Sequence, residues 1–194
     1  MVLIIELLSS VIALFVIVDP LGNVPIFLGL THGTSSEGRK RIFKLALITA
    51  LVLLVVFAIF GKILLGLLMV NINSFRIAGG TLLLILATKI LIYGTWEERS
   101  IRSESAGAVP IAFPLLAGPG AITNVIVINQ TAGMLVALVS IGVVMGVTGL
   151  ILHGIKRINE FLGSVGSIVI ARIMAVFIAA IAIQYIVEGI RASF

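Results

Sequence analysis

Asp19 is the only carboxylate in the interior of a long apolar run, away from its ends, and it opens the motif "DPLGNVP" from Asp19 to Pro25. A charge at the centre of a membrane costs at least about 2.5–3.5 kcal/mol, so a functional role is its default interpretation. Asp19 could bind a coupling ion (Na⁺ or H⁺) or attract a substrate ammonium group. It could also only cap the helix segment that follows, by accepting backbone N–H groups. The residues alone leave these roles open.

A second motif of proline and glycine, "AGPGAIT" from Ala117 to Thr123, also has apolar sequence on both sides. Proline removes a backbone donor, and glycine allows angles that a helix does not use. The freed N–H and C=O groups are tolerated at membrane depth only where protein or a water-filled cavity satisfies them. A plain kink is the alternative for one break, but two matched breaks favour a binding site.

Each half-helix that begins after a break directs its N–H groups and positive dipole end towards the cavity, which suits a carboxylate. The carbonyl groups before each break suit an ammonium group or a cation. The sequence therefore predicts a site for a small zwitterion, an amino acid. Its candidate substrate-binding residues lie at or just after the breaks: Gly22, Asn23, Pro25, Gly118, Pro119, Gly120, Thr123 and Asn124.

Four further polar residues are candidates for a supporting role. Arg76 and Arg172 occupy matched positions, although snorkelling to the interface is the simpler account of both. Thr81 and Gln184 lie on helices expected to line the cavity, and they could instead only bond across helices.

Composition excludes several classes of protein. The chain has 194 residues, 60% apolar and only 11% charged, with a mean hydropathy of +1.30, which is typical of a multi-pass membrane protein. It has no cysteine, its two histidines are 121 positions apart, and no P-loop occurs, so we expect neither an enzyme nor a metal or other cofactor. The net charge of +5 is expected to mark cytoplasmic loops rather than nucleic-acid binding.

Apolar runs of about 20 residues predict an all-α protein of six transmembrane helices in the lipid bilayer. The runs are Leu3–Thr31, Ile42–Met69, Phe75–Tyr93, Ala108–Gln130, Met134–Ile155 and Phe161–Gly189. The breaks fall in the first and fourth of them, at mid-membrane depth. The short connections leave no room for a soluble domain, so the chain is expected to form one transmembrane domain, residues 1–194. No separate targeting peptide is expected, because Glu6 replaces a basic start.

The positions of lysine and arginine predict the orientation. Eight lie in the three connections after the first, third and fifth helices: Arg39, Lys40, Arg41, Lys44, Arg99, Arg102, Lys156 and Arg157. The opposite side has three, Lys62, Arg76 and Arg191. Because basic loops face the cytoplasm, both termini are predicted to lie outside it.

The two halves of the chain are similar. "FRIAGGTLLLILA" opens the third helix and "ARIMAVFIAAIAI" the sixth, and the two breaks are likewise about 97 positions apart. We therefore interpret the chain as two three-helix repeats, about 1–97 and 98–194. Because three is odd, the second repeat enters the membrane from the opposite side, as in many secondary transporters.

With both motifs in place, the whole chain resembles the MarC family of bacterial and archaeal inner-membrane proteins. The resemblance rests on "DPLGNVPIFLGLT" and "FPLLAGPGAIT", and its motif positions here are Asp19, Gly22, Asn23, Pro25, Gly118, Pro119 and Gly120. It implies a cation-driven transporter (a symporter) of small neutral amino acids such as glycine and alanine. It does not decide the direction or the coupling ion.

Two other functions stay open at this point: an exporter or channel for another small solute such as a drug or metabolite, and an intramembrane enzyme or structural subunit. The G-x-x-x-G of Gly142 and Gly146 predicts close helix packing, either inside the fold or in a homo-oligomer.

Overall fold

The computed structural model describes residues 2–24, 27–28, 31, 34–93 and 111–193. In those residues the regular structure is helical throughout. The helices are α1 (Val2–Val18), α3 (Ser36–Leu67), α4 (Ile72–Tyr93), the short π-helical η1 (Ile111–Leu116), α6 (Pro119–Thr131), α7 (Met134–His153) and α8 (Ile155–Arg191).

Four stretches are long and apolar enough to cross a membrane: Ser36–Leu67, Ile72–Ile92, Met134–His153 and Ile168–Arg191. They coincide with the second, third, fifth and sixth predicted helices. The first and fourth are divided, because α1 ends at Val18 and η1 and α6 share the fourth. Residues 108–110, the predicted start of the fourth helix, lie outside the described ranges.

Local sequence explains where two of these helices begin. The Ser35 side chain accepts a hydrogen bond from the Gly38 N–H at 3.1 Å, which caps α3. Pro119 stands in the first turn of α6, where its missing N–H would have no helical partner in any case.

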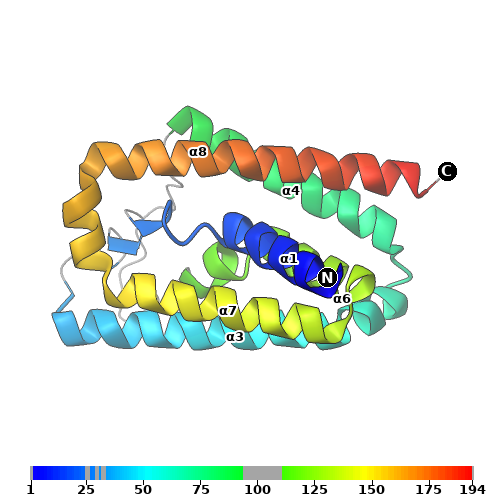
Figure 1. Ribbon diagram of the computed structural model, residues 1–194, viewed down its shortest axis with the longest axis horizontal. Coiled ribbons are helices and arrows are strands. Elements are labelled where there is room, and N and C mark those ends of the chain that lie inside the picture. The colour runs from blue at the N-terminus through cyan, green and yellow to red at the C-terminus, as the bar shows by residue number, and fades with distance from the viewer. Residues whose placement is uncertain (1, 25–26, 29–30, 32–33, 94–110, 194) are drawn as a thin grey trace.

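The helices form a layered bundle (Figure 1). α3 packs along α7, and α4 packs along α8, and in each pair the two helices run in opposite directions. α1 and α6 contact each other and lie between these two pairs. This arrangement places the ends of both broken segments in the middle of the molecule.

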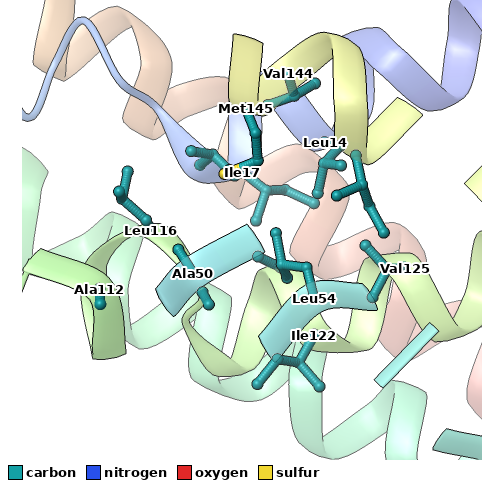
Figure 2. Packing of buried hydrophobic residues seen from close by; sticks show 14 of the residues in the cluster. Leu14, Ile17, Ala50, Leu54, Ala112, Leu116, Ile122, Val125, Val144 and Met145 are labelled. Atoms are coloured by element: carbon teal, nitrogen blue, oxygen red, sulfur yellow. The ribbon is translucent and has the colours of Figure 1, made fainter. Parts of the chain in front are cut away.

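The core lies where the central pair, α1 and α6, meets α3 and α7. Leu14 of α1, Leu54 of α3, Val125 of α6 and Val144 of α7 are completely buried and converge in Figure 2. The outward faces are also apolar, with residues such as Leu135 and Leu150 more than two-thirds exposed. An apolar exterior of this kind suits lipid rather than water.

Glycine allows the close approach of α4 and α8. A Cβ atom on Gly80 would lie 2.7 Å from the Ala182 carbonyl oxygen, and one on Gly189 would lie 2.8 Å from the Asn73 carbonyl oxygen. Gly142 and Gly146 differ, because a Cβ on either would meet no described atom within 4 Å. The G-x-x-x-G of α7 therefore serves no close contact among the described residues, and its role in an oligomer stays a prediction.

α8 begins at Ile155, earlier than the predicted sixth helix, and changes direction at Gly163. Gly163 has φ 64° and ψ 177°, angles that essentially only glycine adopts. The residues before it connect the α3/α7 pair to the α4/α8 pair, and the apolar span starts after it.

Candidate functional site

Asp19 directly follows α1 and caps the turn after it. Its φ of 43° is left-handed, a conformation that aspartate tolerates better than most residues. Its Oδ1 atom accepts a hydrogen bond from the Gly22 N–H at 3.0 Å, and the residue is only 3% exposed. Capping, one of the roles left open by the sequence, is therefore present. It occupies one carboxylate oxygen and does not exclude a second role for the other.

Gly22 and Asn23 complete this turn. A Cβ on Gly22 would lie 2.7 Å from the Asp19 Cγ, so only glycine leaves room for the carboxylate. The Asn23 side chain donates to the Val18 carbonyl at 3.1 Å and thereby satisfies an acceptor that the end of α1 leaves free. Pro25, the remaining candidate of this motif, lies outside the described residues.

The second break lies between η1 and α6. Phe113 has extended angles (φ −141°, ψ 126°), and Gly118 precedes α6 with φ −69° and ψ 168°. The first helical bond of α6 runs from the Ile122 N–H to the Gly118 carbonyl at 2.9 Å. The N–H groups of Gly120 and Ala121 come before that bond, and Gly118 offers no side chain to cap them. These N–H groups therefore have no partner from the helix or its cap, and the positive end of the α6 dipole lies at this break.

Both breaks line one cavity of about 170 Å³. Asp19 and Asn23 come from the first break, and Gly118, Gly120 and Ala121 from the second. A cavity of about 150 Å³ accepts benzene, so this volume suits a solute of a few heavy atoms. The rest of the wall is apolar and comes from four elements: Ile17, Leu82, Leu83, Ile85, Leu86, Ile90, Leu115 and Ile178.

Gly120 leaves the space that one of these apolar residues occupies at the cavity wall. A Cβ on Gly120 would lie 2.6 Å from Cγ of the fully buried Leu83. The absence of a side chain at Gly120 therefore sets the position of Leu83 as well as opening the end of α6. No feature of the sequence distinguishes Leu83, because its neighbours in α4 are equally apolar.

Two candidates on α6 point elsewhere. Thr123 is buried, and its Cγ2 atom lies 2.7 Å from where a Cβ of Gly79 would be, so it packs against α4. The Asn124 side chain donates a hydrogen bond to the hydroxyl of Tyr185 on α8. Both residues therefore hold α6 in place rather than line the cavity. Tyr185 was not among the predicted residues, although a buried tyrosine hydroxyl generally needs a partner.

The four supporting candidates do not line the cavity either. Arg76 is half-buried at the start of α4, and Arg172 is exposed on α8. Thr81 is exposed and donates to the Ile77 carbonyl at 2.8 Å, within its own helix. Gln184 is exposed and donates to Glu188 at 2.9 Å, also within its own helix.

The fold and the site together define a class: an integral membrane protein of apolar helices, with a small cavity at the meeting point of two broken segments. The chain belongs to the MarC family, because the family model described as "MarC family integral membrane protein" matches residues 4–194. The match agrees with the resemblance that both motifs carry.

Relatives occur in archaea and bacteria. The chain is 38% identical over 193 residues to a UPF0056 membrane protein of Archaeoglobus fulgidus, covering 94% of this chain and 91% of the relative. It is 32% identical to the UPF0056 membrane protein YhcE of Escherichia coli, covering 94% and 91%. It is 30% identical to the UPF0056 membrane protein YvbG of Bacillus subtilis, covering 94% and 93%. No solved structure matches the chain.

Proposed function

We propose that the protein is a secondary transporter of small neutral amino acids, of the glycine and alanine type, in the inner membrane. The observation that carries the proposal is the cavity shared by both breaks. It combines a buried carboxylate from the first break with the open N-terminal end of α6 from the second.

The two ends of an amino acid find complementary groups in this cavity. The substrate carboxylate binds the N–H groups of Gly120 and Ala121 at the positive end of α6. The substrate ammonium group lies beside Asn23 and the carbonyl groups at the first break, which leaves the Asp19 carboxylate to the coupling ion. The apolar wall, including Leu83 and Ile178, accepts a hydrogen atom or a methyl group and disfavours a polar or charged side chain.

The helix contacts support two inverted repeats. The extensive pairings of α3 with α7 and of α4 with α8 join helices at equivalent positions of the two halves. The fourth predicted helix contacts α3 through η1 and α6, and the first predicted helix contacts α7 through α1. Two repeats related in this way exchange roles when they rock around a central site, which is the basis of alternating access.

The same arrangement supports the proposed orientation. The basic start of α3, the end of α7 and the start of α8 lie together at one end of the bundle, and the C-terminus lies at the other (Figure 1). We place the basic end in the cytoplasm and both chain termini outside it.

Asp19 is the residue that we assign to coupling. A transporter driven by Na⁺ or H⁺ needs a group whose charge the ion neutralises, and Asp19 is the only carboxylate in the described wall of the cavity. Binding of the ion lowers the cost of the buried charge, so the loaded carrier can rearrange more easily than the empty one.

Uptake into proteoliposomes tests this function. The purified protein should accumulate labelled glycine or alanine when a Na⁺ or H⁺ gradient is imposed, and an excess of either unlabelled amino acid should abolish the accumulation. Empty liposomes and liposomes without a gradient are the controls. Absence of gradient-dependent flux for every small amino acid would contradict the proposal.

The apolar wall favours one alternative, an exporter or channel for a less polar solute such as a drug or metabolite. The described wall of the cavity has thirteen residues, and eight of them are leucine or isoleucine. A flux screen distinguishes the two functions: transport that glycine and alanine fail to inhibit would favour the alternative.

A further inference from the structure

A second cavity of about 280 Å³ lies between α3 and α7, away from the site described above. Its wall comes from one end of each helix: Lys40, Phe43, Lys44 and Leu47 of α3, and Gly149, Leu152 and His153 of α7. We propose that this cavity binds the phosphate headgroup of an anionic phospholipid, with the start of an acyl chain in its apolar part.

The lengths of the two helices place the cavity at the membrane surface. The 20 residues of α7 extend about 30 Å, which equals the thickness of the hydrocarbon core, so its last residue, His153, lies at the interface. The 32 residues of α3 extend about 48 Å, so its polar start projects beyond the core. Lys40 and Lys44 lie on that start and share the cavity with His153.

The charge of the cavity suits a phosphate group. Lys40 and Lys44 are four positions apart, so they lie on one face of α3. Both are exposed, and His153 adds a further hydrogen-bonding group from the opposite helix. Within the described part of its wall there is no carboxylate to neutralise the lysines. Basic cavities between transmembrane helices at this level bind phospholipid headgroups.

The apolar part of the cavity favours a lipid over free phosphate. Phe43 and Leu152 are almost completely buried, and Leu47 lies one helical turn after Phe43, further from the membrane surface. A Cβ on Gly149 would lie 3.0 Å from Leu47, so the glycine keeps space open between the helices. A ligand that fills the cavity therefore needs a charged end and an apolar end.

The experiment measures lipid binding to the purified full chain by native mass spectrometry. Phosphatidylglycerol is titrated against phosphatidylcholine with the same acyl chains, and inorganic phosphate is titrated separately. The test variant is Lys40→Gln/Lys44→Gln. The matched control is Lys156→Gln/Arg157→Gln, which removes two exposed charges at the same end of the bundle but outside the cavity wall.

We expect the native chain to prefer phosphatidylglycerol, and the test variant to weaken that binding by at least about tenfold. The control should change it by less than about threefold. Gly149→Leu, which fills the apolar part without changing charge, should also weaken lipid binding and serves as a second test should the double variant not fold.

Three results would overturn the proposal. Equal binding of both lipids would show that charge is not recognised, and equal loss in the test and control variants would show a diffuse surface effect. Inorganic phosphate that displaces the lipid completely, with no effect of Gly149→Leu, would assign the cavity to free phosphate. None of these results depends on whether the protein transports amino acids.

Discussion

At the scale of single residues, Asp19 has two separable properties: it caps a turn, and it places a carboxylate beside a cavity. Its Oδ1 atom accepts the Gly22 N–H, whereas the charge of the group is not needed for that bond. Asparagine also tolerates left-handed angles and offers the same acceptor. Substitution can therefore remove the charge and keep the turn.

We predict that Asp19→Asn leaves membrane insertion and folding intact and lowers gradient-driven uptake of glycine or alanine by at least about tenfold. Asp19→Ala is the matched comparison, since it also removes the cap and should cost about 0.5–2 kcal/mol of stability. Uptake assays and thermal unfolding in detergent measure the two effects. Normal uptake by Asp19→Asn with unchanged ion dependence would leave Asp19 only its capping role.

Gly120 offers a second test at this scale. In Gly120→Val the new side chain must displace Leu83, which packs within 2.6 Å of the added Cβ and itself lines the cavity. We expect the cavity to shrink and the apparent affinity for substrate to fall by at least about tenfold. Gly142→Val, where a Cβ meets no described atom within 4 Å, is the control and should transport normally. Unchanged affinity in Gly120→Val would make the second break a plain kink.

At the scale of elements, the direction of α8 depends on one backbone conformation. Gly163 adopts φ 64° and ψ 177°, and a side chain there is strained whatever space surrounds it. Gly163→Ala should therefore lower stability by about 1–3 kcal/mol, measured as a lower unfolding temperature in detergent. Gly142→Ala, inside the regular helix α7, should instead be neutral or stabilising by up to about 1 kcal/mol. Equal stability of the two variants would argue against the change of direction at Gly163.

The sequence predicted the breaks well because proline and glycine act locally. The apolar run of α1 ends at Asp19 and α6 begins at Pro119, both within the quoted motifs. Hydropathy likewise predicted the four long spans, since span length follows from bilayer thickness. Both signals need only a few neighbouring residues.

The sequence could not predict which side chains face the cavity. In a membrane both faces of a helix are apolar, so the pattern that marks the buried face of a soluble helix is missing. Thr123 and Asn124 were predicted at the cavity but pack against α4 and α8, and Leu83 was missed. Those contacts join residues more than 35 positions apart, so the neighbouring residues in the sequence do not predict them.

At the scale of the whole molecule, the first half of the chain packs mainly against the second. Each extensive contact of α1, α3 and α4 among the described residues is made with an element of the second half. The Asn129 side chain of α6 also donates to the Ala58 carbonyl of α3 at 2.7 Å. The described helices of the first half therefore bury their apolar faces mainly against the second half and not against one another.

We predict that residues 1–97 expressed alone are inserted but rapidly degraded, and that residues 98–194 expressed together with them restore a stable complex. Co-purification through a tag on one half, followed by the uptake assay, measures the recovery. A matched cut inside α3, after Leu54, should not be tolerated, because it divides a membrane span. A first half that is stable and monodisperse alone would contradict the prediction.

The opposite directions of paired helices also have an electrical consequence. The dipoles of α3 and α7 oppose each other, as do those of α4 and α8, so the proposed rocking of the two repeats would move little net dipole across the membrane. A membrane potential does work of about 2.3 kcal/mol per elementary charge per 100 mV. In the proposed cycle, the potential would therefore act mainly on the charge of Asp19 and on the solutes bound in the cavity. A zwitterionic substrate has no net charge. The current per transport cycle would therefore measure the charge of the coupling ion and the charge of the Asp19 side chain. The helices themselves would contribute almost nothing to it.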